Sequence, residues 1–361
     1  MPPGVHARKD IVWLNFHAWY KRIFLTVGET ETYRSLWPAH FTAAEEKAGK
    51  ELLDHDQLEA LLNEKMAQSL NQVISSHPDL IDYYDAILVD EGQDFRPAWI
   101  ALLRRSLAKG GEYLLVADKS QNIYGTARQL TDEAMDGCGF RGDWSELKEC
   151  YRIPSQFIPL LADFAQLFLP DDTRDLPVIS RERQLKLNFQ PCFPRWVQTY
   201  PVPTTSTVLA EVLRLATARL ATAKDVEHLP ISDITVVVFT QRQGLELVRQ
   251  LEAKGIKCIH TFAPDDRRKS RRLKVAFYKG SARVKVTTIH SFKGLESRAL
   301  VIEVDAPIPG ALKDQQMALI YTAMSRLKHT PRGAYLTVVC NHQEMENYGK
   351  IWPDFVQTPE C

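Results

Sequence analysis

The stretch YYDAILVDEGQDF, Tyr83 to Phe95, lies at the centre of the predicted fold. Its apolar run, Ala86 to Val89, ends at two carboxylates, Asp90 and Glu91. An apolar run this short that stops at a polar turn predicts a buried parallel strand. Because ligands bind at the carboxyl ends of the strands in an open α/β sheet, the acidic pair is a candidate ligand site. An ordinary helix cap is the alternative.

Composition narrows the class of protein only in part. The 361 residues suffice for two domains, or three. Basic and acidic residues number 45 each, so any nucleic-acid site must be a local patch. The six cysteines form no C-x-x-C pair, which predicts neither a zinc site nor a disulfide framework. No apolar run is long enough for a membrane helix, so we expect a soluble, cytoplasmic protein without a membrane partner.

Gly92, Gln93 and Asp94 follow the acidic pair and favour a ligand site over an ordinary helix cap. The stretch DEGQD resembles motif II, the Walker B element, of superfamily 1 helicases of the UvrD/Rep type. The resemblance implies ATP and Mg²⁺ as cofactors, with Asp90 as the Mg²⁺ ligand and Glu91 as the catalytic residue that orients the attacking water. It also implies an α/β fold with two RecA-like lobes and mainly parallel sheets, of the P-loop NTPase type.

An aromatic stretch near the start, NFHAW at Asn15 to Trp19, resembles the "TFH" element on the single-stranded DNA path of these helicases. The resemblance implies that His17 contacts DNA. A buried strand–helix junction is the alternative explanation.

Two further motifs follow the Walker B-like stretch. ADKSQNIYG resembles motif III, which implies that Gln121 senses the γ-phosphate and that Tyr124 lies on the DNA side. LKECYRI resembles motif IV, which implies that Tyr151 stacks on adenine and that Arg152 reaches the γ-phosphate. For Arg152 the alternative is an ion pair with a surface acid.

The second lobe is predicted from Ile234 to Phe239, an unbroken β-branched strand. Thr240 can cap the helix that follows, and Gly255 ends that helix before a strand at Ile256 to Ile259. A basic cluster from Arg267 to Lys274 is either a solvated loop or a phosphate contact.

The stretch from Val284 to Val304 resembles motif V between two strands. The resemblance implies that Thr288 and His290 contact DNA and that Glu296 holds the ribose, while Gly294 permits a tight turn with the backbone close to ligand.

Leu319 to Thr330 resembles motif VI, which implies an arginine-finger role for Arg326. A strand is expected at Ala334 to Val339. No signal is readable after Asn341.

We expect three regions. Residues 1–150 form a partial first lobe with a helical insertion at about 29–77, residues 151–230 form an irregular and helical connection, and residues 231–361 form the second lobe. Prolines predict irregular structure from Pro159 to Pro230, with one helix at Leu209 to Ala223.

One element of such an ATPase is missing from the sequence. A P-loop, G-x-x-x-x-G-K-[ST], cradles the phosphates in this family. The two Gly-Lys pairs, Gly49-Lys50 and Gly349-Lys350, are followed by Glu51 and Ile351, so neither fits. Three explanations stay open: a fragment of a helicase, a split ATPase whose P-loop comes from another chain, or a protein that has lost hydrolysis.

The resemblance implies an ATP-dependent translocase on single-stranded DNA that unwinds duplexes in the 3′ to 5′ direction. Its expected partners are single-stranded DNA or DNA with a 3′ overhang, and a P-loop-bearing or nuclease partner protein. The competing hypothesis is a non-catalytic DNA- or protein-binding subunit.

Overall fold

The structure is a computed structural model of the whole chain. Its contacts divide the chain into two compact units, one of Met1–Ala117 and Gln129–Asp143, the other of Asp118–Arg128 and Trp144–Cys361. We describe each unit by itself. The residues described are 11–37, 55–118, 138–140, 144–145, 147, 150, 152–171, 191–200, 204–217, 219–221, 226–263, 272–273, 277, 282–305 and 313–358.

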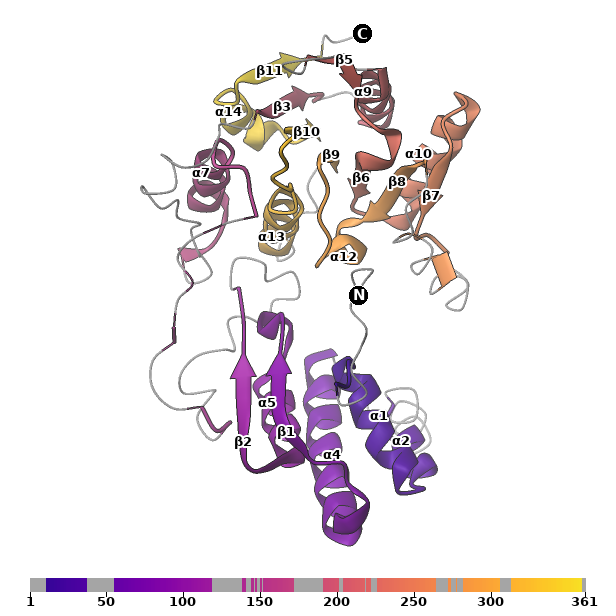
Figure 1. Cartoon of the computed structure of the whole chain (residues 1–361), viewed down its shortest axis with the longest axis vertical. Coiled ribbons are helices and arrows are strands. Elements are labelled where there is room, and N and C mark those ends of the chain that lie inside the picture. The colour runs from indigo at the N-terminus through magenta and orange to yellow at the C-terminus, as the bar shows by residue number, and fades with distance from the viewer. Residues whose placement is uncertain are drawn as a thin grey trace. The chain divides into compact units, whose positions relative to one another are not determined.

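In the described part of the first unit, four α-helices pack beside two strands (Figure 1). The helices are α1 (Phe16–Thr26), α2 (Thr30–Ser35), α4 (His55–Ser76) and α5 (Pro97–Leu103), and the strands are β1 (Tyr84–Val89) and β2 (Leu107–Leu115). Asn15 caps α1, because its side chain accepts a hydrogen bond from the backbone of Ala18. Pro97 opens α5, where its missing N–H costs nothing.

The strands β1 and β2 are parallel, as predicted, but β1 is not a buried strand. One face of this pair, with Val89 and Leu115, packs on the core of the unit. The other face carries Leu88 and Leu114, which are 71% and 53% exposed. The expectation of full burial was wrong. Among the described residues β2 is the one strand that pairs with β1, and helices cover one face of this two-stranded sheet.

The helix α5 ends at Leu103. Gly110 and Gly111 lie further on, inside β2, where the pairing register with β1 shifts between Tyr84 and Ala86. Gly110 has a positive φ of 83°, and a Cβ on Gly111 would lie 2.8 Å from the carbonyl oxygen of Asp85. The glycine pair therefore takes up the extra residues of a bulge.

The second unit contains a seven-stranded sheet whose pairings are all parallel, in the order β11-β3-β10-β9-β6-β8-β7. Its strands are β3 (Cys192–Gln198), β6 (Ile234–Val238), β7 (Cys258–His260), β8 (Val284–Thr288), β9 (Ala299–Val304), β10 (Ala334–Cys340) and β11 (Asp354–Gln357). A separate antiparallel pair joins β4 (Arg219–Ala221) to β5 (Val226–His228).

Helices cover both faces of the seven-stranded sheet. One core lies against α7 (Ile158–Phe168), α12 (Ile289–Phe292), α13 (Lys313–Met324) and α14 (Glu346–Gly349). The other lies against α9 (Thr205–Thr217) and α10 (Gln241–Ala253). Figure 1 shows these layers around the sheet. The predicted α/β class with mainly parallel sheets is confirmed.

Local predictions in the second unit have mixed outcomes. Thr240 and Gln243 form the reciprocal capping box at the start of α10, and Gly255 follows that helix with a positive φ of 80°, as predicted. The connection was only partly predicted, because α7 and β3 lie where we expected irregular chain, and α9 begins four residues earlier than the predicted helix. The end of the chain also contributes a strand, β11, for which the sequence carried no signal.

Within the described residues, no helix is both long and apolar enough to cross a membrane. The predicted boundaries at residues 150 and 230 stay predictions. The basic cluster Arg267 to Lys274 lies outside the described residues except for Arg272.

Candidate nucleotide and nucleic-acid site

The acidic pair lies at the carboxyl end of β1, where the sequence predicted it. Asp90 is exposed, and its Oδ1 accepts a hydrogen bond of 2.9 Å from the backbone N–H of Glu91. Among the described residues, Glu91 alone of the non-glycine residues has a positive φ, of 55°. Its Oε2 accepts a hydrogen bond of 2.6 Å from Nε2 of Gln93. A left-handed backbone costs a residue with a side chain about 1 kcal/mol or more, and such strain concentrates at functional sites.

The turn after Glu91 fits tightly against the neighbouring strand. The backbone N–H of Gly92 donates a hydrogen bond of 2.7 Å to the carbonyl of Val116, just beyond β2. A Cβ on Gly92 would lie 2.5 Å from Cδ1 of Leu115. Only glycine therefore allows the acidic turn to lie this close to β2, and Gln93 is fully buried beneath it.

His17 lies in the first turn of α1 within an aromatic cluster. Its ring contacts that of Trp99 edge to face, with centroids 5.1 Å apart, and Phe16 stacks on Trp99 at 4.5 Å. Trp99 belongs to α5, the helix after the acidic turn. Burial lowers the pKa of His17 below its ordinary value. The cluster joins the NFHAW stretch to the helix that follows motif II, while contact with DNA stays a prediction.

Three predicted site residues, Gln121, Tyr124 and Tyr151, lie outside the described residues. Their roles stay predictions.

The motif V stretch forms the end of β8, the short helix α12 and a turn. The hydroxyl of Thr288 accepts a hydrogen bond of 3.3 Å from the backbone of Ser291, so Thr288 caps α12 and is largely buried. His290 is exposed, and partial burial of its ring, followed by the charge of Lys293, lowers its pKa. Gly294 has a φ of 80°, which confirms the tight turn predicted there.

Two predicted nucleotide residues meet in the second unit. Nε of Arg152 lies 3.7 Å from Oε1 of Glu296. The other carboxylate oxygen of Glu296 lies 3.3 Å from Nζ of Lys328. The alternative expected for Arg152, an ion pair with an acid near the surface, is thus observed, and the acid is the residue predicted to hold the ribose.

Arg326 lies two residues before Lys328 and is only 2% exposed. Its Nε is shielded from solvent and makes no hydrogen bond within the described residues, although other interactions hold the side chain. The arginine-finger role therefore requires Arg326 to leave its buried position, and it stays a prediction.

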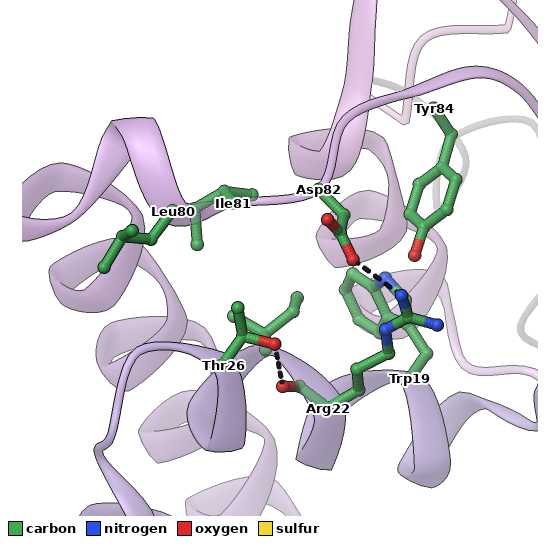
Figure 2. Close-up of a pocket in the computed structure, with 8 residues that line it drawn as sticks. Trp19, Arg22, Thr26, Leu80, Ile81, Asp82 and Tyr84 are labelled. Atoms are coloured by element: carbon green, nitrogen blue, oxygen red, sulfur yellow. Dashed lines mark hydrogen bonds and ion pairs between the residues drawn. The ribbon is translucent and has the colours of Figure 1, made fainter.

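A pocket in the first unit lies away from the acidic turn of that unit. Figure 2 shows it between α1 and the start of β1, with an ion pair of 2.9 Å between Arg22 and Asp82. Tyr84, the first residue of β1, lines it, so the pocket lies at the amino end of the strand and Asp90 at the opposite end. Because ligands of parallel sheets bind at carboxyl ends, this pocket is not our candidate site.

Reasoning from the sequence missed two residues that contact predicted site residues. In the sequence, Gln93 was noted only as one letter of the DEGQD motif. A side-chain amide two residues after Glu91 could have indicated the hydrogen bond that it donates to that carboxylate. Lys328 carried no signal, because its contact with Glu296 spans 32 positions of sequence.

Residues 29–127 match the UvrD/REP helicase N-terminal domain. The matched segment covers just over a quarter of the chain and includes Asp90 and Glu91, and it ends before Arg152. The match supports a UvrD-like helicase and a helicase-type function.

Two solved structures resemble parts of the chain. One is the C-terminal domain of a possible DNA helicase from Lactobacillus plantarum WCFS1, with 13% identity and a TM-score of 0.33, covering 58% of this chain and 99% of that one. The other is the C-terminal domain of the DEAD-box protein Dbp5, with 15% identity and a TM-score of 0.33, covering 48% and 92%. These likenesses are too weak to assign a function. A search of curated proteins found no match.

Proposed function

We propose that the protein is an ATP-dependent translocase on single-stranded DNA with 3′ to 5′ helicase activity of the UvrD-like type. The observation that carries the proposal is the family match over residues 29–127, which contains the acidic turn with its strained Glu91. The predicted residues beyond the match, from Arg152 to Arg326, follow the order of the remaining helicase motifs.

Asp90 fits the magnesium of MgATP. Its carboxylate is exposed at the carboxyl end of β1, and Mg²⁺ in ATPase sites binds one or two carboxylates together with substrate phosphates. No group of three or more His, Cys, Asp or Glu side chains among the described residues could hold a metal alone. A magnesium ion held by Asp90 and phosphates agrees with that finding, and it would neutralise charge on the phosphates.

Glu91 orients the attacking water in this proposal. Orientation requires a carboxylate with a fixed direction, and two features restrict Glu91: its left-handed backbone and the hydrogen bond from buried Gln93. Such restriction lowers the entropy lost when water, carboxylate and phosphate align.

We also propose nucleotide roles for residues of the second unit. Arg152 and Arg326 stabilise charge on the γ-phosphate, and Glu296 holds the ribose. Gly294 gives the turn beside Glu296 its left-handed backbone. The proposal includes two further nucleotide residues, Gln121 and Tyr151, and four DNA contacts, which are His17, Tyr124, Thr288 and His290.

ATP hydrolysis in this proposal requires a P-loop, and neither Gly-Lys pair of the sequence fits the pattern. In the proposal, a further segment of a longer protein or a partner chain supplies it. Co-purification of the chain with its natural partners, followed by an ATPase assay, distinguishes these sources.

The test of the proposal is ATPase activity of the complete, folded protein, with any P-loop-bearing partner, on single-stranded DNA. We expect turnover that DNA stimulates and that Glu91→Gln abolishes, while Glu64→Gln, at an exposed carboxylate of α4 that also accepts a glutamine amide, leaves it unchanged. Absence of turnover, or turnover that survives Glu91→Gln, overturns the proposal.

The missing P-loop favours one other function, a non-catalytic DNA- or protein-binding subunit. This function predicts DNA affinity that is independent of ATP. Equilibrium binding with and without ATP distinguishes the two, because a 100-fold effect of ATP requires about 2.7 kcal/mol of coupling.

A further inference from the structure

Three separate segments of the second unit are tied together by backbone hydrogen bonds. The N–H of Ser297 donates to the carbonyl of Arg326 at 3.0 Å, and the N–H of Lys328 donates to the carbonyl of Ser297 at 2.8 Å. The N–H of His329 donates to the carbonyl of Arg152 at 2.8 Å. We call these residues, together with the adjacent Glu296, the junction. Its backbone brings Arg152, Glu296 and Lys328 together, so their proximity does not depend on flexible side chains.

The side chains of the junction carry an excess of positive charge. Glu296 lies 3.7 Å from Arg152 and 3.3 Å from Lys328, so one carboxylate serves two cations. The side chain of Lys328 is 55% exposed and that of Glu296 is 29% exposed. Ion pairs this exposed contribute little to stability and exchange readily for other partners.

An unsatisfied donor also lies in the junction. Nε of Arg152 is shielded from solvent and makes no hydrogen bond within the described residues. Its distance of 3.7 Å to Glu296 exceeds hydrogen-bond range. A shielded donor without an acceptor is costly in a folded protein, which points to an acceptor that arrives with a ligand.

We propose that Lys328 is a phosphate-binding residue of the nucleotide site and that, in the absence of nucleotide, it forms an ion pair with Glu296. In this arrangement Glu296 binds Arg152 and Lys328 until a nucleotide arrives. The carboxylate then turns to the ribose hydroxyls, and both cations become available to phosphate oxygens. Ammonium and guanidinium groups are the two usual phosphate-binding side chains. This inference rests on the proposed function, and it adds an accessible cation two residues beyond the buried Arg326.

The first experiment measures binding of ATP, ADP and adenosine to the full chain by calorimetry. We expect Lys328→Ala to weaken ATP binding about tenfold, ADP binding less, and adenosine binding by less than twofold, because only the phosphates are charged. Lys328→Arg should retain most of the affinity. The matched control is Lys350→Ala, which removes a lysine of similar exposure, 52%, from its ion pair with Glu346.

A second experiment uses inorganic tripolyphosphate, which lacks a ribose. Glu296→Gln should bind it several-fold more tightly than the unchanged chain, because both cations lose their competitor, whereas Lys328→Ala should bind it more weakly. A structural role for the ion pair would weaken binding in both variants.

The outcomes separate the inference from the proposed function. A protein that hydrolyses ATP, but whose affinity is unaffected by Lys328→Ala or falls equally for ATP and adenosine, overturns the inference alone. A protein that neither binds nor hydrolyses ATP overturns both.

Discussion

Gln93 donates a hydrogen bond of 2.6 Å from its buried side-chain amide to Oε2 of Glu91. Glu91 has the left-handed backbone of the acidic turn, so a buried amide holds the direction of a carboxylate on a strained backbone. This is the carboxylate that we propose to orient the attacking water.

Replacing Gln93 with leucine tests this relationship. Leucine has a similar volume but cannot donate, so Gln93→Leu should lower kcat for ATP roughly tenfold or more, with little change in KM. Steady-state kinetics with single-stranded DNA measures the effect. The control is Gln68→Leu, which removes an exposed glutamine that donates to Glu64 at 3.0 Å. Equal losses in both variants would contradict a specific role for Gln93.

Gly92→Ala should destabilise the first unit by about 1–3 kcal/mol, because the new Cβ would lie 2.5 Å from Cδ1 of Leu115. Chemical denaturation measures the change. Gly28→Ala is the control, since that position has a φ of 84° but open space around it, so it should cost about 1 kcal/mol from backbone strain alone. A smaller loss at Gly92 than at Gly28 would refute the close approach.

Arg326 combines a proposed catalytic role with burial. Arg326→Ala should destabilise the protein by about 2 kcal/mol or more, because it removes a large side chain that is 2% exposed. Arg249→Ala, at a side chain that is 76% exposed, should change stability by no more than about 0.5 kcal/mol. Urea denaturation measures the free energy of unfolding of both variants. Similar losses in the two would mean that Arg326 lies at the surface in solution.

Glu303 predicts a pH dependence of stability. Burial raises its pKa, despite a hydrogen bond of 2.6 Å from Thr204, and its Oε2 has no hydrogen-bond partner among the described residues. A raised pKa means that the folded state favours the protonated carboxyl. Its contribution to stability is therefore complete below the ordinary value of 4.5 and is lost as pH rises through the folded-state pKa.

Glu303→Gln should consequently raise the melting temperature near pH 8 and have little effect near pH 4. Thermal melts of variant and parent across this range measure the difference between them. Glu346→Gln, at a side chain of α14 that is 30% exposed, is the control and should show no such trend. A gain from Glu303→Gln that is the same at both pH values would contradict the prediction.

His290 predicts a pH dependence of DNA binding. Partial burial and the charge of Lys293 lower its pKa below 6.5, so the ring is mainly neutral at pH 7.5. A phosphate contact favours the charged ring, so affinity for single-stranded DNA should increase as pH falls below 6.5. His290→Gln should remove this increase and change affinity little at pH 8, as measured by fluorescence anisotropy. His77→Gln, in the other unit, should retain the increase.

Local structure was predicted well where neighbouring residues decide it. The capping box of Thr240 and Gln243 and the left-handed Gly255 depend on side chains and glycines within a few positions. The strand β6 was predicted from its unbroken β-branched run. The strands β8 and β9 were predicted as the two strands on either side of the motif V stretch.

Elements whose stability depends on distant partners were missed. The strand β3 contains Pro194, which argued against a strand, yet its fully buried Trp196 and its pairing with β10 and β11 hold it in the sheet. Leu88 was predicted to be buried, and its exposure depends on which strands and helices cover β1.

The sequence by itself determined the order of the motifs, the acidic turn at the end of β1 and the parallel α/β class, because strand periodicity and turn chemistry are local. Only the tertiary structure placed Gln93 beneath Glu91, buried Arg326 and brought Lys328 to the carboxylate of Glu296. These relationships depend on backbone direction and on packing between segments far apart in the chain, which local sequence patterns do not reveal.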